Sequence, residues 1–91
     1  MAKKVRIRGV SVPVKRSALS RKGYIGYSWK GKKRRIEVDR NLRGKALLST
    51  LIHEMLHQLD HRLSERTVLG LEEGIVELIL ENPEIFDRLW E

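Results

Sequence analysis

The sequence predicts an α+β fold in which a small N-terminal antiparallel sheet is followed by helices. Two patterns predict it. Apolar and charged residues alternate along stretches of residues 5–39, which is the period of strands with one buried face. From about residue 42 the apolar residues recur every three or four positions, which is the period of helices with one apolar stripe. We therefore expect a sheet from the first half of the chain and two or three helices from the second.

The strands are expected in three stretches of the first half. Val5 to Arg8 alternates apolar and basic residues, and valines at 10, 12 and 14 continue the alternation. Residues 24–29 are rich in aromatic side chains, and residues 34–39 alternate again after a turn-like Lys-Gly-Lys. We expect 24–29 and 34–39 to form a hairpin within the sheet.

The first helix is expected to begin near Leu42–Lys45. Its apolar stripe consists of Leu48, Leu51, Ile52, Met55 and Leu59. His53 and His57 fall outside this stripe, on the side that also carries Ala46. Because histidines buried in a helical core would lie within the stripe, these two are available for another role.

A second helix is expected to follow Ser64, which is a good N-cap residue with Glu65 in the first turn behind it. Its apolar stripe consists of Val68, Leu71, Ile75, Leu78 and Ile79. Asn82-Pro83 ends it, because proline cannot continue a helix interior. Pro83 suits the first turn of a short last helix that carries Ile85, Phe86, Leu89 and Trp90.

Composition limits the function classes. The chain has 91 residues, which we interpret as a single minimal domain over 1–91, and a net charge of +7. It has no cysteine, so thiolate metal sites and disulfides are excluded. We expect no membrane span and no signal peptide, and we expect a cytoplasmic location. Residues 1–45 hold 16 Lys and Arg against two acids, whereas residues 46–91 hold three Arg against ten acids. The basic half is a candidate nucleic-acid surface, or a feature that aids solubility and attracts the acidic half.

The motif that carries the chemistry is His53-Glu54-Met55-Leu56-His57, an H-E-x-x-H sequence inside the first expected helix. Residues four apart share one face of a helix, so both imidazoles can bind one zinc ion. The glutamate between them can reach a zinc-bound water and act as its general base. We therefore expect His53 and His57 to be metal ligands and Glu54 to be catalytic.

The third ligand is open among three residues. His61 lies about 12 Å from His53 along a continuous helix, so it could share an ion only if the helix unwinds after His57. Glu65 and Glu72 lie on the shoulder of the second helix's apolar stripe, and either could face the first helix. A simple helical hairpin would bring residues 68–72 level with the histidines, which favours Glu72.

From Tyr24 to the C-terminus, the chain resembles the short gluzincin-like zinc metallopeptidases, or minigluzincins, a type found among small phage and prokaryotic proteins. The matching residues are Gly23-Tyr24, Ile36-Glu37-Val38-Asp39, Leu51 to His57, Leu63-Ser64-Glu65, Val68 and Asn82-Pro83-Glu84. The H-E-x-x-H motif is specific to zincins, and the other matches support the subgroup.

The resemblance implies that Glu65 is the third zinc ligand, with Glu72 as the second choice for that role. It also implies a sheet packed on the active-site helix, with an edge strand that pairs with an extended peptide. Residues 34–39 are our candidate for that edge. Tyr24 or Tyr27 is a candidate for stabilising an oxyanion.

The function expected from these residues is zinc-dependent hydrolysis of peptide bonds, with one zinc per chain and a peptide or protein as substrate. A domain this small has little cleft of its own, so the peptidase is expected to be latent or to need a partner. The alternative is an inactive zincin-derived binding module that keeps the metal site for stability and binds nucleic acid through its basic half. Glu54 favours the enzyme, because a purely structural site needs no base.

Overall fold

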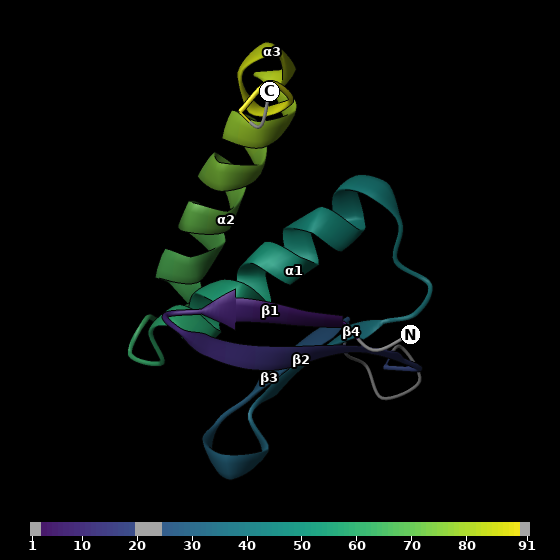
Figure 1. Ribbon diagram of the computed structural model, residues 1–91, viewed down its shortest axis with the longest axis vertical. Coiled ribbons are helices and arrows are strands. Elements are labelled where there is room, and N and C mark those ends of the chain that lie inside the picture. The colour runs from purple at the N-terminus through teal and green to yellow at the C-terminus, as the bar shows by residue number, and fades with distance from the viewer. Residues whose placement is uncertain (1–2, 20–24, 90–91) are drawn as a thin grey trace.

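Four strands form one sheet, and a long helix, α1, lies across one of its faces (Figure 1). The computed structural model describes residues 3–19 and 25–89. Its elements in chain order are β1 (Lys3–Ile7), β2 (Val10–Ser17), β3 (Gly26–Trp29), the short 3-10 helix η2 (Gly31–Lys33), β4 (Arg35–Asp39), α1 (Gly44–Leu59), α2 (Glu65–Leu80) and α3 (Pro83–Phe86). The α+β class, the N-terminal sheet and the three helices after it are as predicted.

The sheet has the order β1-β2-β4-β3. β1 and β2 form a hairpin whose two turn residues, Arg8 and Gly9, both have positive φ angles, as a tight two-residue hairpin turn requires. β3 and β4 form the predicted antiparallel hairpin, in which Tyr27 lies opposite Glu37. The pair β2 and β4 is parallel, so the sheet is mixed and not purely antiparallel.

This order corrects the expected edge strand. Residues 34–39 were expected at the edge, but β4 lies between β2 and β3, and β3 is the edge strand. Ile36 and Val38 are fully buried beneath α1 in the core, which suits an interior strand. The charges that alternate with them make an ion pair, with Arg35 Nε 2.9 Å from Glu37 Oε1.

The core lies between the sheet and α1. Its buried residues are Ile7, Val12, Ile36 and Val38, and Leu42, Leu47, Leu51 and Met55 pack against them. Two members of the predicted stripe of α1, Leu51 and Met55, therefore face the sheet, whereas Leu59 is exposed.

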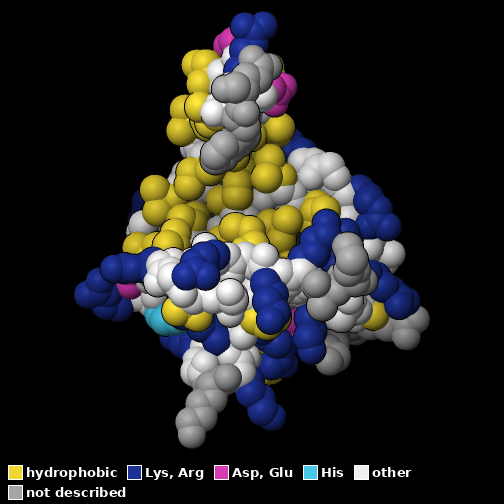
Figure 2. Space-filling model, in the orientation of Figure 1, with side chains coloured by type: hydrophobic (Ala, Val, Ile, Leu, Met, Phe, Trp, Pro, Cys, Tyr) yellow, Lys and Arg dark blue, Asp and Glu magenta, His cyan; other side chains and the backbone are white. Residues whose placement is uncertain are grey.

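α2 packs on α1 with Val68 and Val76 buried, and its predicted cap is present, since Ser64 Oγ accepts a hydrogen bond of 3.1 Å from Thr67 N. Two leucines of its predicted stripe, Leu71 and Leu78, are exposed. Hydrophobic side chains accordingly gather over the helices in Figure 2, while Lys and Arg gather around the strands. No helix in the described part of the chain is long and apolar enough to cross a membrane.

A line of buried polar residues joins α1 to the edge strand. Thr50, Glu54 and Gln58 are spaced four apart on α1, so they share one face of the helix. Gln58 is 2 % exposed. Its amide nitrogen donates to Ser28 Oγ at 2.5 Å and to the carbonyl of Trp29 at 2.8 Å. Its side-chain oxygen accepts from Arg34 Nε, and its backbone carbonyl accepts from the same guanidinium at 2.7 Å. The end of α1 is thereby fixed to β3 and to the residue before β4.

We predict that Gln58→Leu lowers the free energy of unfolding by about 1–3 kcal/mol, because it leaves buried polar partners without hydrogen bonds. Chemical denaturation with a chelator present measures this. Lys45→Leu, an exposed change on the same helix, is the control and should change stability by less than about 0.5 kcal/mol. Equal effects of the two substitutions would show that the network does not hold α1 to β3.

Candidate metal centre

His53 and His57 lie one helical turn apart on α1. They face away from the core between α1 and the sheet, and they are only partly exposed to solvent. Their side chains are 16 % and 21 % exposed. Their rings are 5.0 Å apart between centroids and meet edge to face. The helical spacing thus brings the two imidazoles together, as the sequence predicts.

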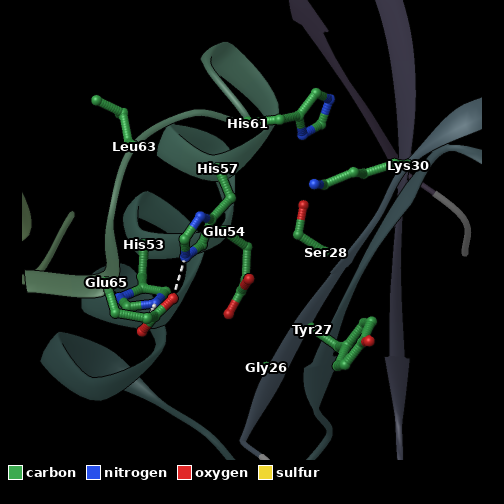
Figure 3. Close-up of a pocket in the computed structure, with 10 residues that line it drawn as sticks. All are labelled: Gly26, Tyr27, Ser28, Lys30, His53, Glu54, His57, His61, Leu63 and Glu65. Carbon is green, nitrogen blue, oxygen red and sulfur yellow. Dashed lines mark hydrogen bonds and ion pairs between the residues drawn. The ribbon is translucent and has the colours of Figure 1, made fainter.

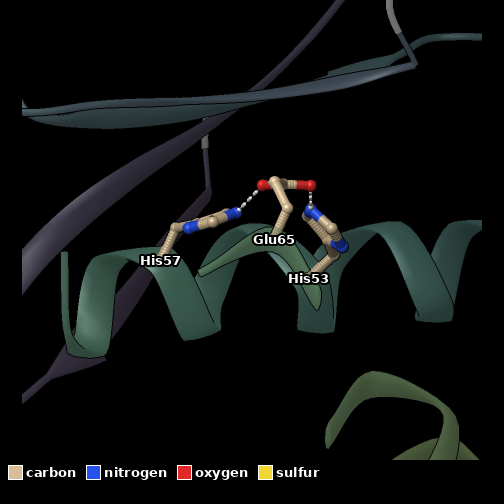
Figure 4. A group of neighbouring side chains, drawn as sticks. All are labelled: His53, His57 and Glu65. Carbon is tan, nitrogen blue, oxygen red and sulfur yellow. Dashed lines mark hydrogen bonds and ion pairs between the residues drawn. The ribbon is translucent and has the colours of Figure 1, made fainter. Parts of the chain in front are cut away.

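Glu65 lies over both histidines (Figure 4). One carboxylate oxygen is 3.2 Å from His53 Nε2, and the other hydrogen-bonds to His57 Nε2. The five-residue connection between α1 and α2 makes this possible. α1 ends at Leu59, Asp60 binds the backbone and side chain of Arg62, and Ser64 caps α2, so that α2 begins at Glu65 itself.

The donor atoms of these three residues suit a metal ion. Among the described residues, His53, His57 and Glu65 form a group whose ligand atoms all lie within 4.8 Å of one another. Two imidazole nitrogens and one carboxylate oxygen are a donor set that zinc takes in catalytic sites, where a fourth position stays open for water or substrate. The three side chains could therefore hold such an ion.

Glu72 contacts His53 from the side opposite Glu65. Its carboxylate oxygen is 2.7 Å from His53 Nδ1, and both side chains are 16 % exposed. A carboxylate there fixes the proton on Nδ1, which leaves Nε2 free to bind on the Glu65 side. The structure thus places Glu72 as an orienting partner of His53, whereas the helical-hairpin estimate favoured it as a ligand.

His61 lines the same cavity but lies outside the group of three. The helix ends before it, and Figure 3 shows its ring near Lys30, away from Glu65. The unwinding that would let His61 join the pair is therefore present, yet it turns the ring toward the other wall of the cavity.

Glu54 extends from α1 toward β3 (Figure 3) and is 7 % exposed. Burial raises the pKa of its carboxyl above the ordinary value of 4.5. The positive charges of His53 and His57 oppose this increase, and the negative charges of Glu65 and Glu72 add to it. A carboxyl with a raised pKa is suited to accept a proton near neutral pH and release it again.

Burial alone would lower the pKa of His53, but the hydrogen bond with Glu72 and the surrounding carboxylates outweigh it, and the pKa is raised. The carboxylates therefore favour positive charge at His53. A divalent cation at Nε2 would meet the same negative potential, which makes the site attractive to metal.

The site opens into a cavity of about 470 Å³ between α1 and the edge strand. Gly26 and Ser28 of β3 line one wall, and Glu54 and His57 line the other. At Gly26 an added Cβ would lie 2.6 Å from Thr50 Cγ2 and 2.9 Å from Glu54 Oε2, so only glycine allows this approach. Sequence reasoning missed Gly26, although an isolated glycine inside an expected strand is a signal of close backbone approach.

Tyr27 is among the residues that line the cavity, but its ring does not face Glu54. Residues 26 and 28 point toward α1, so the side chain between them points to the opposite face of the sheet, and Figure 3 shows its ring turned away from Glu54. The oxyanion role considered for Tyr27 is therefore not supported. Tyr24, the other candidate, lies outside the described residues.

The chain matches no protein-family model, no curated protein and no solved structure. The assignment of a function therefore depends on the residues and geometry of this site.

We predict one bound zinc per chain, a lower melting temperature after chelation, and a graded loss of affinity among variants. Glu65→Ala should weaken zinc binding by more than about 100-fold, and Glu72→Ala by about 10–100-fold, as expected for loss of an orienting partner. His61→Ala and the surface control Glu73→Ala should have little effect. Competition with a chelating dye measures these affinities, and a fall confined to Glu72→Ala or His61→Ala would contradict the ligand set.

We also predict that Gly26→Ala lowers the free energy of unfolding by about 1–3 kcal/mol, because its Cβ overpacks Thr50 and Glu54. The matched control is Gly70→Ala on α2, where an added Cβ meets nothing within 4 Å. That change should stabilise the helix by about 0.5–1 kcal/mol. Denaturant titration of both variants tests the close approach, and equal behaviour would disprove it.

Proposed function

We propose that this protein is a zinc-dependent peptidase. The observation that carries the proposal is the joint arrangement of a three-residue metal-ligand group with the buried carboxylate of Glu54 at one cavity wall. The resemblance to minigluzincins, which rests on sequence motifs, points to the same activity.

In this proposal His53, His57 and Glu65 hold the zinc ion. Zinc bound there would polarise the scissile carbonyl and lower the pKa of a water molecule to about 7. Glu54 accepts the proton of the attacking water and then donates it to the nitrogen of the leaving amine. Its raised pKa suits the first step, because a carboxylate with an ordinary pKa is a weaker base and would accept the proton less readily.

The substrate would bind along β3. This strand pairs with β4 on one side only and borders the cavity, so its outer backbone groups can pair with an extended peptide. Because Gly26 lets β3 lie against Glu54, a peptide paired with the outer edge of β3 would run close to this carboxylate. Because the cavity of about 470 Å³ is small for a protein substrate, we propose that a partner or second subunit completes the cleft, or that the enzyme is latent without one.

The alternative is a binding module in which the metal only stabilises the fold. Glu54 argues against it. A buried carboxylate destabilises a fold unless it is paired, and a structural site of three ligands has no use for it. We further propose the cytoplasm as the place of action, because the chain contains no cysteine and needs no oxidising compartment to fold.

The experiment that tests the proposal compares zinc-loaded wild type with Glu54→Gln on a library of fluorogenic peptides. Glu54→Gln should retain zinc and lose at least about 100-fold in cleavage rate, because a base is needed for turnover and not for coordination. Glu73→Gln, an exposed change of the same chemistry on α2, should leave the rate unchanged. Equal cleavage rates for Glu54→Gln and wild type would refute the proposal.

A further inference from the structure

The face of the sheet opposite α1 carries aromatic and basic side chains. Strand alternation and the pairing register place one set of residues on this face, which we call the outer sheet face: Lys4, Arg6, Lys15, Tyr27, Trp29 and Arg35. Their partners in register, such as Pro13 opposite Lys4 and Glu37 opposite both Lys15 and Tyr27, share the same side. The core residues Val12, Ile36 and Val38 point the other way, toward α1.

Two aromatic rings stand next to each other on the edge strand of this face. Tyr27 and Trp29 are 41 % and 40 % exposed, with ring centroids 4.9 Å apart. The guanidinium of Arg35 lies 4.1 Å from the centroid of the Trp29 ring. Two side chains of this size are left in contact with water although the fold has few aromatic residues to spare for its core.

Cations share this face with the rings. Lys15 on β2 and Lys4 and Arg6 on β1 are exposed, two and three strands from β3 in the sheet. The acids of this face are masked, since Glu37 pairs with Arg35 at 2.9 Å and Asp39 is buried and accepts a hydrogen bond from the backbone of Asn41. Lys15 lies two strands from Tyr27, or about 10 Å, which an extended nucleotide chain spans.

We propose that the outer sheet face binds single-stranded nucleic acid. Bases stack on Tyr27 and Trp29, and phosphates contact Lys4, Arg6 and Lys15. Exposed aromatics on a sheet, flanked by cations, suit unpaired bases, because the bases of a duplex are already stacked and cannot reach the rings. An acidic peptide would use the cations but has no need for paired rings. The activity is additional to peptide hydrolysis, because the metal centre lies on the other side of β3.

Fluorescence anisotropy with labelled oligothymidine and oligouridine of about 12 nucleotides tests the proposal at about 50 mM salt. Binding of either oligonucleotide is expected. The affinity should fall steeply with added salt, because phosphate contacts release counterions. Tighter binding of a duplex of equal length, or displacement by polyglutamate at equal charge concentration, would overturn the proposal.

Variants separate stacking from charge. Tyr27→Leu and Trp29→Leu should each weaken binding by about tenfold, whereas Phe86→Leu on α3 should not. The triple change of Lys4, Arg6 and Lys15 to Gln should reduce the salt slope by about 2. The helix control changes Lys45 on α1, Arg66 on α2 and Arg88 just after α3 to Gln, which removes the same charge away from the sheet.

Circular dichroism monitors the fold of each variant. If Trp29→Leu does not fold, Tyr27→Leu and the charge variants still decide the outcome. No binding by wild type at about 50 mM salt would overturn the proposal. It would also be overturned if the helix control lost as much affinity as the outer-face variant, or if affinity did not depend on either ring.

Discussion

The close contact between α1 and β3 is the constraint on which the site depends. α1 presents apolar residues to the middle of the sheet and the polar line Thr50, Glu54 and Gln58 to its edge. Gln58 satisfies its amide with the side chain of Ser28 and the backbone of Trp29, so the edge strand is fixed at one end of the helix. Gly26 lets the strand come within contact of Glu54 at the other end. With both ends fixed, the buried carboxylate is held at the cavity wall and cannot turn to solvent.

Features that depend on local sequence could be predicted, and those that depend on distant partners could not. The helices, the Ser64 cap and the β3–β4 hairpin follow from periodicity and capping, which act within a few residues. The parallel pairing of β2 with β4 joins residues more than 20 apart, and nothing local marks it. The alternation of apolar and charged residues in β4 would be the same in an edge strand and in an interior strand. In the interior, the charged side chains can pair with each other. Nothing local marks Gln58 as buried, since its partners come from β3 and from Arg34.

The site shows the same division. His53 and His57 meet through helical spacing alone, so their proximity could be derived from the motif. The roles of Glu65 and Glu72 depend on where α2 begins and how it crosses α1. A simple helical hairpin favours Glu72 beside the histidines, but the five-residue connection starts α2 at Glu65, directly over them. Glu72 then meets His53 from behind, at Nδ1, so the two glutamates contact opposite nitrogens of one ring. In the proposed zinc site, that difference would separate a metal ligand from a residue that orients one.

Strand alternation allows β3 to serve two surfaces at once. Gly26 and Ser28 face α1 and must stay small, because the helix and Glu54 occupy the space beside them. Tyr27 and Trp29 face the opposite side, where nothing in α1 limits their size. A shift of the β3 register by one residue would turn the rings of Tyr27 and Trp29 toward α1, against Glu54 and Gln58. The rings would then have no apolar partner. The packing of α1 therefore fixes which residues of β3 line the proposed metal centre. It also fixes the outward direction of the aromatic pair. The proposed nucleic-acid surface and the proposed peptidase site are thus coupled in structure through one strand, although they use different side chains and opposite faces of the sheet.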